Sequence, residues 1–110
     1  MDEQQAIDAL GALSQQTRLR IVRLLISESA GLPAGEIAAA TGVSPSALSF
    51  HLSALEHASL VSSTRQSRQI LYQATFATIA GVINYLLDDC CSGNTAILSL
   101  CGIHNNRDCC

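Results

Sequence analysis

Lysine and tryptophan are absent from this sequence, and aromatic residues make up only 4% of it. No apolar run approaches the roughly 18 residues that a membrane-spanning helix needs, so we expect no membrane span. The N-terminal stretch is acidic and lacks the basic start of a secretion signal, which favours a cytoplasmic protein. Cysteine is missing from the first 89 residues, which argues against a fold stapled throughout by disulfides.

Apolar residues supply 48% of the 110 residues, enough for one domain with an aliphatic core. We expect a helical domain over residues 1–92 and a cysteine-containing tail over residues 93–110. A chain of this size has limited burial, which favours a dimer that shares apolar surface. The net charge of −3 argues mildly against a nucleic-acid partner, because DNA-binding domains are usually basic. Five of the six Arg nevertheless gather in residues 18–23 and 65–68.

The stretch 42–60 has the pattern of a DNA-reading helix. Ser44 occupies a helix N-cap position, and Pro45 follows at the first helical position. The next apolar residues recur at helical spacing and predict one buried face: Leu48, Leu52 and Leu55. Small and hydroxyl side chains lie off that face and suit a close approach to bases and phosphates in the major groove. An ordinary amphipathic helix of a small bundle is the alternative.

The residues before this stretch predict three more helices, over residues 3–13, 16–28 and 33–40. The helix over 33–40 is joined to the reading helix by a short turn that contains Gly42. Two helices joined in this way form a helix-turn-helix, in which the second helix reads the groove and the first braces it.

Two β-branched runs follow, over residues 60–64 and 69–73, with a polar turn between them at residues 65–68. They predict a hairpin, and a hairpin placed after a helix-turn-helix is a wing. Arg65 and Arg68 flank its tip and can lie against phosphate or in the minor groove, while a solvated turn is the alternative. A closing helix over residues 75–91 carries a long apolar stripe. Together with the first helix it is the predicted dimer seam.

This order of elements resembles the ArsR/SmtB family of metal-responsive winged-helix repressors, over roughly residues 6–93. Three segments carry the resemblance: LGALSQQTRLRIVRLL, GEIAAATGVSPSALSFHLSALEHASLV and SRQILYQA. The run LSFHLSALEHASLV followed by FATIAGVINYLLDDCCSG is similar to the arsenical-resistance branch of the family.

The resemblance implies a mainly α, winged helix-turn-helix homodimer that binds double-stranded operator DNA and leaves it when an inducer binds. By the same analogy, wing contacts come from Arg65 and Arg68. The reading helix would touch DNA through Ser44, Ser46, Ser49 and His51. His51 also has a simpler interpretation, in which it packs or forms a hydrogen bond near the turn.

The resemblance also implies an inducer site of thiolates at the end of the closing helix. Other inducer sites of the family need Cys in residues 33–41, Cys near the N-terminus or His in residues 75–91, and this sequence has none of these. Cys90 and Cys91 match the family pattern, but the Pro and close third Cys of relatives are missing. The next thiol is Cys101, and Cys109 and Cys110 are the alternates.

The chemistry of three thiolates suits As(III) or Sb(III), whereas zinc prefers four ligands. Neighbours on a helix point about 100° apart, so Cys90 and Cys91 can hold one ion only if the helix frays there. Residues 91 to 101 can span up to roughly 33–36 Å, so distance is no obstacle. A thiol-redox repressor and a Cd- or Zn-responsive repressor on the same scaffold remain alternatives. No nucleophile and base are paired in the sequence, and we expect no enzyme activity.

Overall fold

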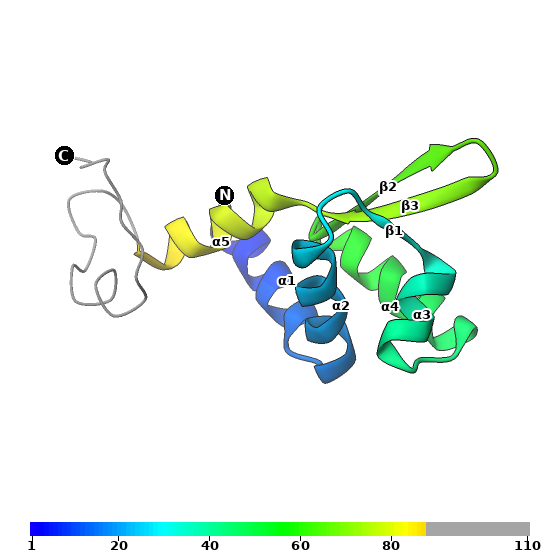
Figure 1. Cartoon of the computed structure of the whole chain (residues 1–110). Coiled ribbons are helices and arrows are strands. Elements are labelled where there is room, and N and C mark those ends of the chain that lie inside the picture. Colours follow the sequence, from blue (N-terminus) through cyan, green and yellow to red (C-terminus); the bar gives the residue numbers. More distant parts are fainter. Residues whose placement is uncertain (88–110) are drawn as a thin grey trace.

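The computed structural model describes residues 1–87, which form a mainly helical winged fold and confirm the predicted fold class (Figure 1). The helices are α1 (Glu3–Leu13), α2 (Gln16–Ser27), α3 (Ala34–Thr41), α4 (Pro45–His57) and α5 (Phe76–Leu87). The strands are β1 (Leu32–Pro33), β2 (Val61–Gln66) and β3 (Gln69–Ala74). The β2–β3 hairpin and α5 extend from opposite ends of the helical body (Figure 1). The predicted domain boundary at 92/93 lies outside the described residues.

Helix α1 begins with a capping box, because the Asp2 side chain accepts from the Gln5 backbone N–H and the Gln5 side chain accepts from the Asp2 backbone N–H. Its inward face is built from small side chains: Ala6, Ala9 and Ala12 are buried. Two of its larger apolar residues, Ile7 and Leu10, are exposed, whereas Leu13 is half-buried and packs against the core. Alanines allow α1 to lie close to its neighbours, and Ile7 and Leu10 remain free for another surface.

The core lies between α2, α3, α4 and the start of the wing. Its largest fully buried side chains are Ile21, Leu25, Ile37, Leu48, Leu55 and Leu60. The predicted inner face of α4 is therefore confirmed, since Leu48, Leu52 and Leu55 are all buried. In α2 the buried residues are Ile21, Val22 and Leu25, whereas Leu19 and Ile26 are exposed.

The sheet has a third strand that the sequence did not predict. Its order is β1-β3-β2, and Leu32 and Pro33 of β1 pair antiparallel with Tyr72 and Leu71. The predicted helix start at Pro33 is wrong by one residue, since Pro33 belongs to β1 and forms the N-cap of α3. A contact between distant segments favours this extra strand: Gln73 Nε2 donates to the carbonyls of Ser29 and Ala30 at 3.4 and 3.3 Å and so holds the loop before β1 against β3.

The wing strands are longer than predicted, and the turn between them is shorter. Strand β2 continues through Arg65 to Gln66, where Gln66 pairs with Gln69, so only Ser67 and Arg68 form the turn. Ser67 has a φ of 57°, the left-handed conformation that two-residue hairpin turns require. Backbone pairing of the two strands therefore reaches into the polar segment that the sequence alone assigns to the turn.

Helices α1 and α5 carry much of the exposed apolar surface of the described residues. In α5 only Val82 is buried, whereas Phe76, Ile83 and Leu86 are 51%, 41% and 64% exposed. Ile7 of α1 is 54% exposed. No helix within residues 1–87 is long and apolar enough to cross a membrane.

Candidate nucleic-acid interface

The helix-turn-helix is formed by α3 and α4 with three residues between them. Gly42 is the C-cap of α3: its φ of 73° lies in the left-handed region, and its N–H donates to the Ala38 carbonyl at 2.8 Å. Ser44 is the N-cap of α4: its Oγ accepts from the Ala47 backbone N–H at 3.3 Å, and Pro45 follows at the first helical position. The C-cap of α3 and the N-cap of α4 therefore lie only two positions apart, which makes the turn between the two helices short.

The outward face of α4 is lined with hydroxyls, as predicted. Ser44, Ser46 and Ser49 are exposed, and Ser53 continues the same face one turn later. Ser44 accepts the cap hydrogen bond, but its own O–H remains free to donate. This face offers both donors and acceptors on short side chains, which is the chemistry that phosphates and base edges in the major groove can bind.

His51 lies at the edge of this face and is half-buried. Its Nδ1 accepts a hydrogen bond from the Nε of Arg18 at 3.2 Å. An accepting Nδ1 carries no proton, so the ring proton lies on Nε2. The hydrogen bond supports the simpler interpretation of His51, while its predicted contact with DNA stays a prediction that would use Nε2.

The wing presents its two arginines away from the core. Arg65 and Arg68 are exposed, with Arg65 in β2 opposite Ile70 and Arg68 in the two-residue turn. A further hydrogen bond ties the wing to α4, since the Ser63 Oγ donates to Glu56 Oε2 at 3.0 Å. The structure thus links the hairpin base directly to the helix expected to read DNA, and two guanidinium groups lie near the hairpin tip.

Arg18 of α2 also contributes to the surface around α4. The Gln15 side chain accepts from its backbone N–H at 2.8 Å at the start of α2. Its side chain crosses to α4, where the guanidinium carbon lies 5.6 Å from the centre of the Phe50 ring. No sequence signal pairs Arg18 with α4, because the residues lie more than 30 positions apart.

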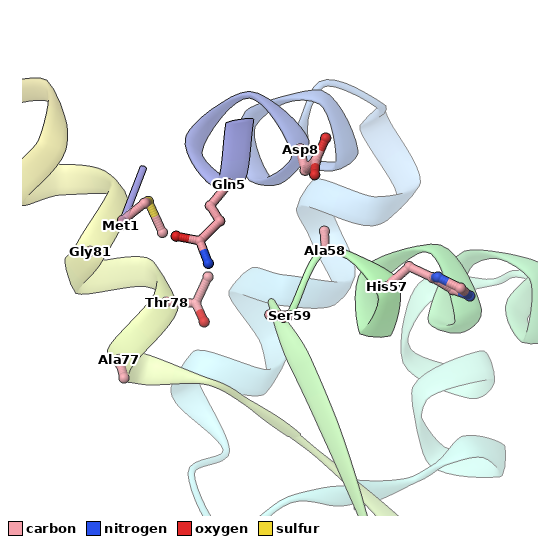
Figure 2. Close-up of a pocket in the computed structure, with 9 residues that line it drawn as sticks. All are labelled: Met1, Gln5, Asp8, His57, Ala58, Ser59, Ala77, Thr78 and Gly81. Carbon is pink, nitrogen blue, oxygen red and sulfur yellow. The ribbon is translucent and has the colours of Figure 1, made fainter. Parts of the chain in front are cut away.

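A separate cavity of about 350 Å³ lies between α1, the end of α4 and α5 (Figure 2). Met1, Gln5 and Thr78 point into it, and Met1 lies against Gly81 of α5. Two of its polar side chains already have partners: Gln5 accepts from the Asp2 N–H, and Asp8 accepts from Gln4 Nε2. None of the predicted DNA-contacting residues lines this cavity.

The predicted thiolate ligands Cys90, Cys91 and Cys101, and the alternates Cys109 and Cys110, lie outside the described residues. Within residues 1–87, no group of three or more His, Cys, Asp or Glu side chains is arranged to hold a metal ion. The donor set proposed for a metalloid therefore rests on the sequence of the C-terminal segment.

Comparison with known proteins places these features in a family. A family model described as a helix-turn-helix domain matches residues 13–64, from the end of α1 to β2. The chain is 36% identical over 88 residues to the HTH-type transcriptional regulator YgaV of Escherichia coli K12, covering 80% of this chain and 88% of YgaV. It is 33% identical over 87 residues to the nodulation protein NolR of Rhizobium meliloti, covering 79% of this chain and 70% of NolR.

Solved structures show the same fold. An ArsR-like transcriptional regulator from Rhodococcus sp. RHA1 superposes with a TM-score of 0.71 at 25% identity, covering 94% of this chain and 95% of that one. The transcriptional repressor BigR from Xylella fastidiosa has a TM-score of 0.61 at 30% identity, covering 73% and 80%. The homodimeric winged helix-turn-helix domain of Mb0332 from Mycobacterium bovis has a TM-score of 0.65 at 23% identity, covering 94% and 89%, a likeness of fold.

The relatives and the geometry agree on the kind of protein. The matched segment contains α3, α4 and the first residues of β2, and so includes the exposed hydroxyl face of α4 that suits DNA. YgaV and the Rhodococcus protein, whose lengths this chain mostly covers, are described as transcriptional regulators, a kind of protein that is not an enzyme. With 36% identity to YgaV and a winged fold shared with ArsR-like regulators, the chain belongs to the ArsR family of DNA-binding transcriptional regulators.

Proposed function

We propose that this regulator is a repressor that binds operator DNA as a homodimer and is released by As(III) or Sb(III) bound to C-terminal thiolates. The observation that carries the operator-binding part is the exposed hydroxyl face of α4, held beside the arginine-bearing wing by the hydrogen bond between Ser63 and Glu56. Ser44, Ser46, Ser49 and His51 would contact the major groove. Arg65 and Arg68 would contact phosphate.

The exposed apolar stripe supports the homodimer. On α5, Phe76, Ala80 and Ile83 recur at helical spacing, and all three are exposed. Such a stripe loses contact with water if a second copy packs on it. A two-fold dimer would present two α4 helices to half-sites that are one turn of B-DNA apart, about 34–36 Å from centre to centre. A small rotation at the seam would spoil that spacing.

The cysteines support an inducer site coupled to this seam. Cys90 and Cys91 follow Leu87, the last described residue of α5, within four positions of the sequence. Thiolates of Cys90, Cys91 and Cys101 would supply the three sulfur ligands that As(III) and Sb(III) prefer, with Cys109 or Cys110 as substitutes. A ligand bound here would act on the helix that forms the dimer seam. A coupling of about 1–3 kcal/mol would lower operator affinity roughly 5- to 150-fold.

A gel-shift titration tests the proposal. The probe is the duplex that the purified protein selects from a randomised library, and arsenite is added to saturation. We expect release of the wild type, and no release of a variant in which all five Cys are replaced by Ser. Single Cys-to-Ser variants at 90, 91, 101, 109 and 110 would then identify the ligands. Unchanged operator affinity at saturating arsenite would refute the metalloid part while leaving operator binding intact.

The two alternatives give different results in the same assay. A thiol-redox repressor would release DNA with peroxide and regain it with a reductant. A Cd- or Zn-responsive repressor would release DNA with those ions, and cobalt spectra would show tetrahedral thiolate coordination. The proposed repressor should instead respond to arsenite and antimonite at a stoichiometry of three thiolates per metalloid.

A further inference from the structure

Phe50 is the large apolar side chain on the outward face of α4. Phe50 is 65% exposed, although it lies in the middle of a helix whose other outward residues include Ser46, Ser49 and Ser53. At 100° per residue, position 50 points almost directly away from the buried face formed by Leu48, Leu52 and Leu55. A phenyl ring therefore occupies the centre of the surface expected to enter the major groove.

The ring is held in place by two neighbours rather than left free. The guanidinium carbon of Arg18 lies over it at 5.6 Å from the ring centre, within the range of a cation–π contact. The His51 ring packs against it edge to face, at 5.8 Å and 65°. Arg18 also donates to His51 Nδ1, so the three side chains form one closed cluster. Such a cluster reduces the rotamer freedom that Phe50 would lose on binding.

A phenyl ring can recognise one kind of group on the edges of bases in the major groove. It cannot form a hydrogen bond with guanine N7 and O6, adenine N6 and N7 or cytosine N4, and covering these groups would leave them unsatisfied. The C5-methyl group of thymine is the apolar group that base edges present there, and contact with it removes apolar surface from water.

We infer that Phe50 is a specificity-determining residue that reads the C5-methyl group of a thymine in each half-site, an inference that rests on the operator binding proposed above. Arg18 and His51 act as positioning residues that hold the ring. Ser44, Ser46 and Ser49 provide polar contacts on the same helix, and Phe50 adds a contact that favours thymine over the other bases at one position.

The test removes the methyl group without changing base pairing. The probe is the duplex selected by the wild-type protein from a randomised library, remade with deoxyuridine in place of thymidine at one position at a time, in both half-sites together. Burying one methyl contributes about fourfold in affinity per half-site, so we expect the wild type to bind the critical duplex about fifteenfold more weakly. Phe50→Ala should bind the thymine and uracil duplexes equally.

Three controls separate a loss of folding or of general DNA binding from a loss of base recognition. Phe50→Ala should retain the helical circular dichroism of the wild type, since Ala is a good helix former and the ring is outside the core. It should also bind a random-sequence duplex with unchanged affinity, because that binding depends on phosphate contacts. Ser53→Ala on the same helix should keep the preference for thymine.

The results separate this inference from the proposed function. A wild type that tolerates uracil at every thymine of its selected site would overturn the role of Phe50 and leave operator binding intact. The role of Phe50 would also be overturned if Phe50→Ala discriminated between thymine and uracil as strongly as the wild type. A wild type that selects no sequence at all would overturn both.

Discussion

Replacing Ile83 by Ala should weaken the homodimer, and the structure supplies a matched control on the wing. Ile83 of α5 is 41% exposed and Ile70 of β3 is 43% exposed, so the two side chains present similar apolar surface. Only Ile83 belongs to the exposed α5 stripe that also contains Phe76. The wing and α5 lie at opposite ends of the molecule (Figure 1). The same truncation therefore tests two positions that differ in their relation to the seam.

The size of the effect follows from the exposed fraction of Ile83. Full burial of an Ile side chain contributes roughly 1.5–3 kcal/mol, and 41% of that is about 0.6–1.2 kcal/mol per copy. A two-fold interface contains two copies, so the loss is about 1.2–2.5 kcal/mol, or roughly an 8- to 70-fold rise in the dimer dissociation constant. Sedimentation equilibrium over a dilution series measures this constant. Equal dissociation constants for Ile83→Ala, Ile70→Ala and the wild type would refute the seam.

Three further predictions concern the wing, the cap of α4 and the core. Arg68→Ala should weaken operator binding, because a dimer would lose one phosphate contact per half-site. The plot of the logarithm of the binding constant against the logarithm of the salt concentration should become shallower by about 2, and an unchanged slope in a salt titration would contradict this. Ser44→Ala should lower the free energy of unfolding, measured in urea, by about 1 kcal/mol, whereas Ser44→Gly should lower it by only a few tenths of a kcal/mol. Both variants should weaken operator binding equally in gel shifts. Leu55→Ala should cost about 2–5 kcal/mol in urea unfolding, since Leu55 is fully buried, whereas truncation of the exposed Leu19 should cost far less.

The reading helix and the wing could be predicted because their signals are local. The cap at Ser44, the proline after it and the spacing of Leu48, Leu52 and Leu55 all act within one segment, and the structure confirms each of them. The hairpin was also predictable from two β-branched runs around a polar turn. The contacts of Ser46, Ser49, Arg65 and Arg68 with DNA stay predictions, although the structure leaves all four exposed.

The parts that the sequence did not predict depend on contacts between distant segments. Strand β1 forms because Leu32 pairs with Tyr72, which lies forty positions away in the sequence. The pattern of residues 29–33 gives no indication of this partner. The buried face of α1 consists of alanines, whose small side chains let the helix lie close to its neighbours, and Ile7 is on the exposed side. A helical spacing of apolar residues shows that a face exists but does not show which surface covers it.

Local signals in the sequence were enough to place the start of α4 and the face of α4 that enters the core, since caps and periodicity act over a few residues. In contrast, the contact of Arg18 with α4, where it forms a cluster with Phe50 and His51, becomes visible in the folded chain alone. That contact depends on the packing of α2 against α4. Packing brings together side chains whose separation along the chain carries no signal of their proximity.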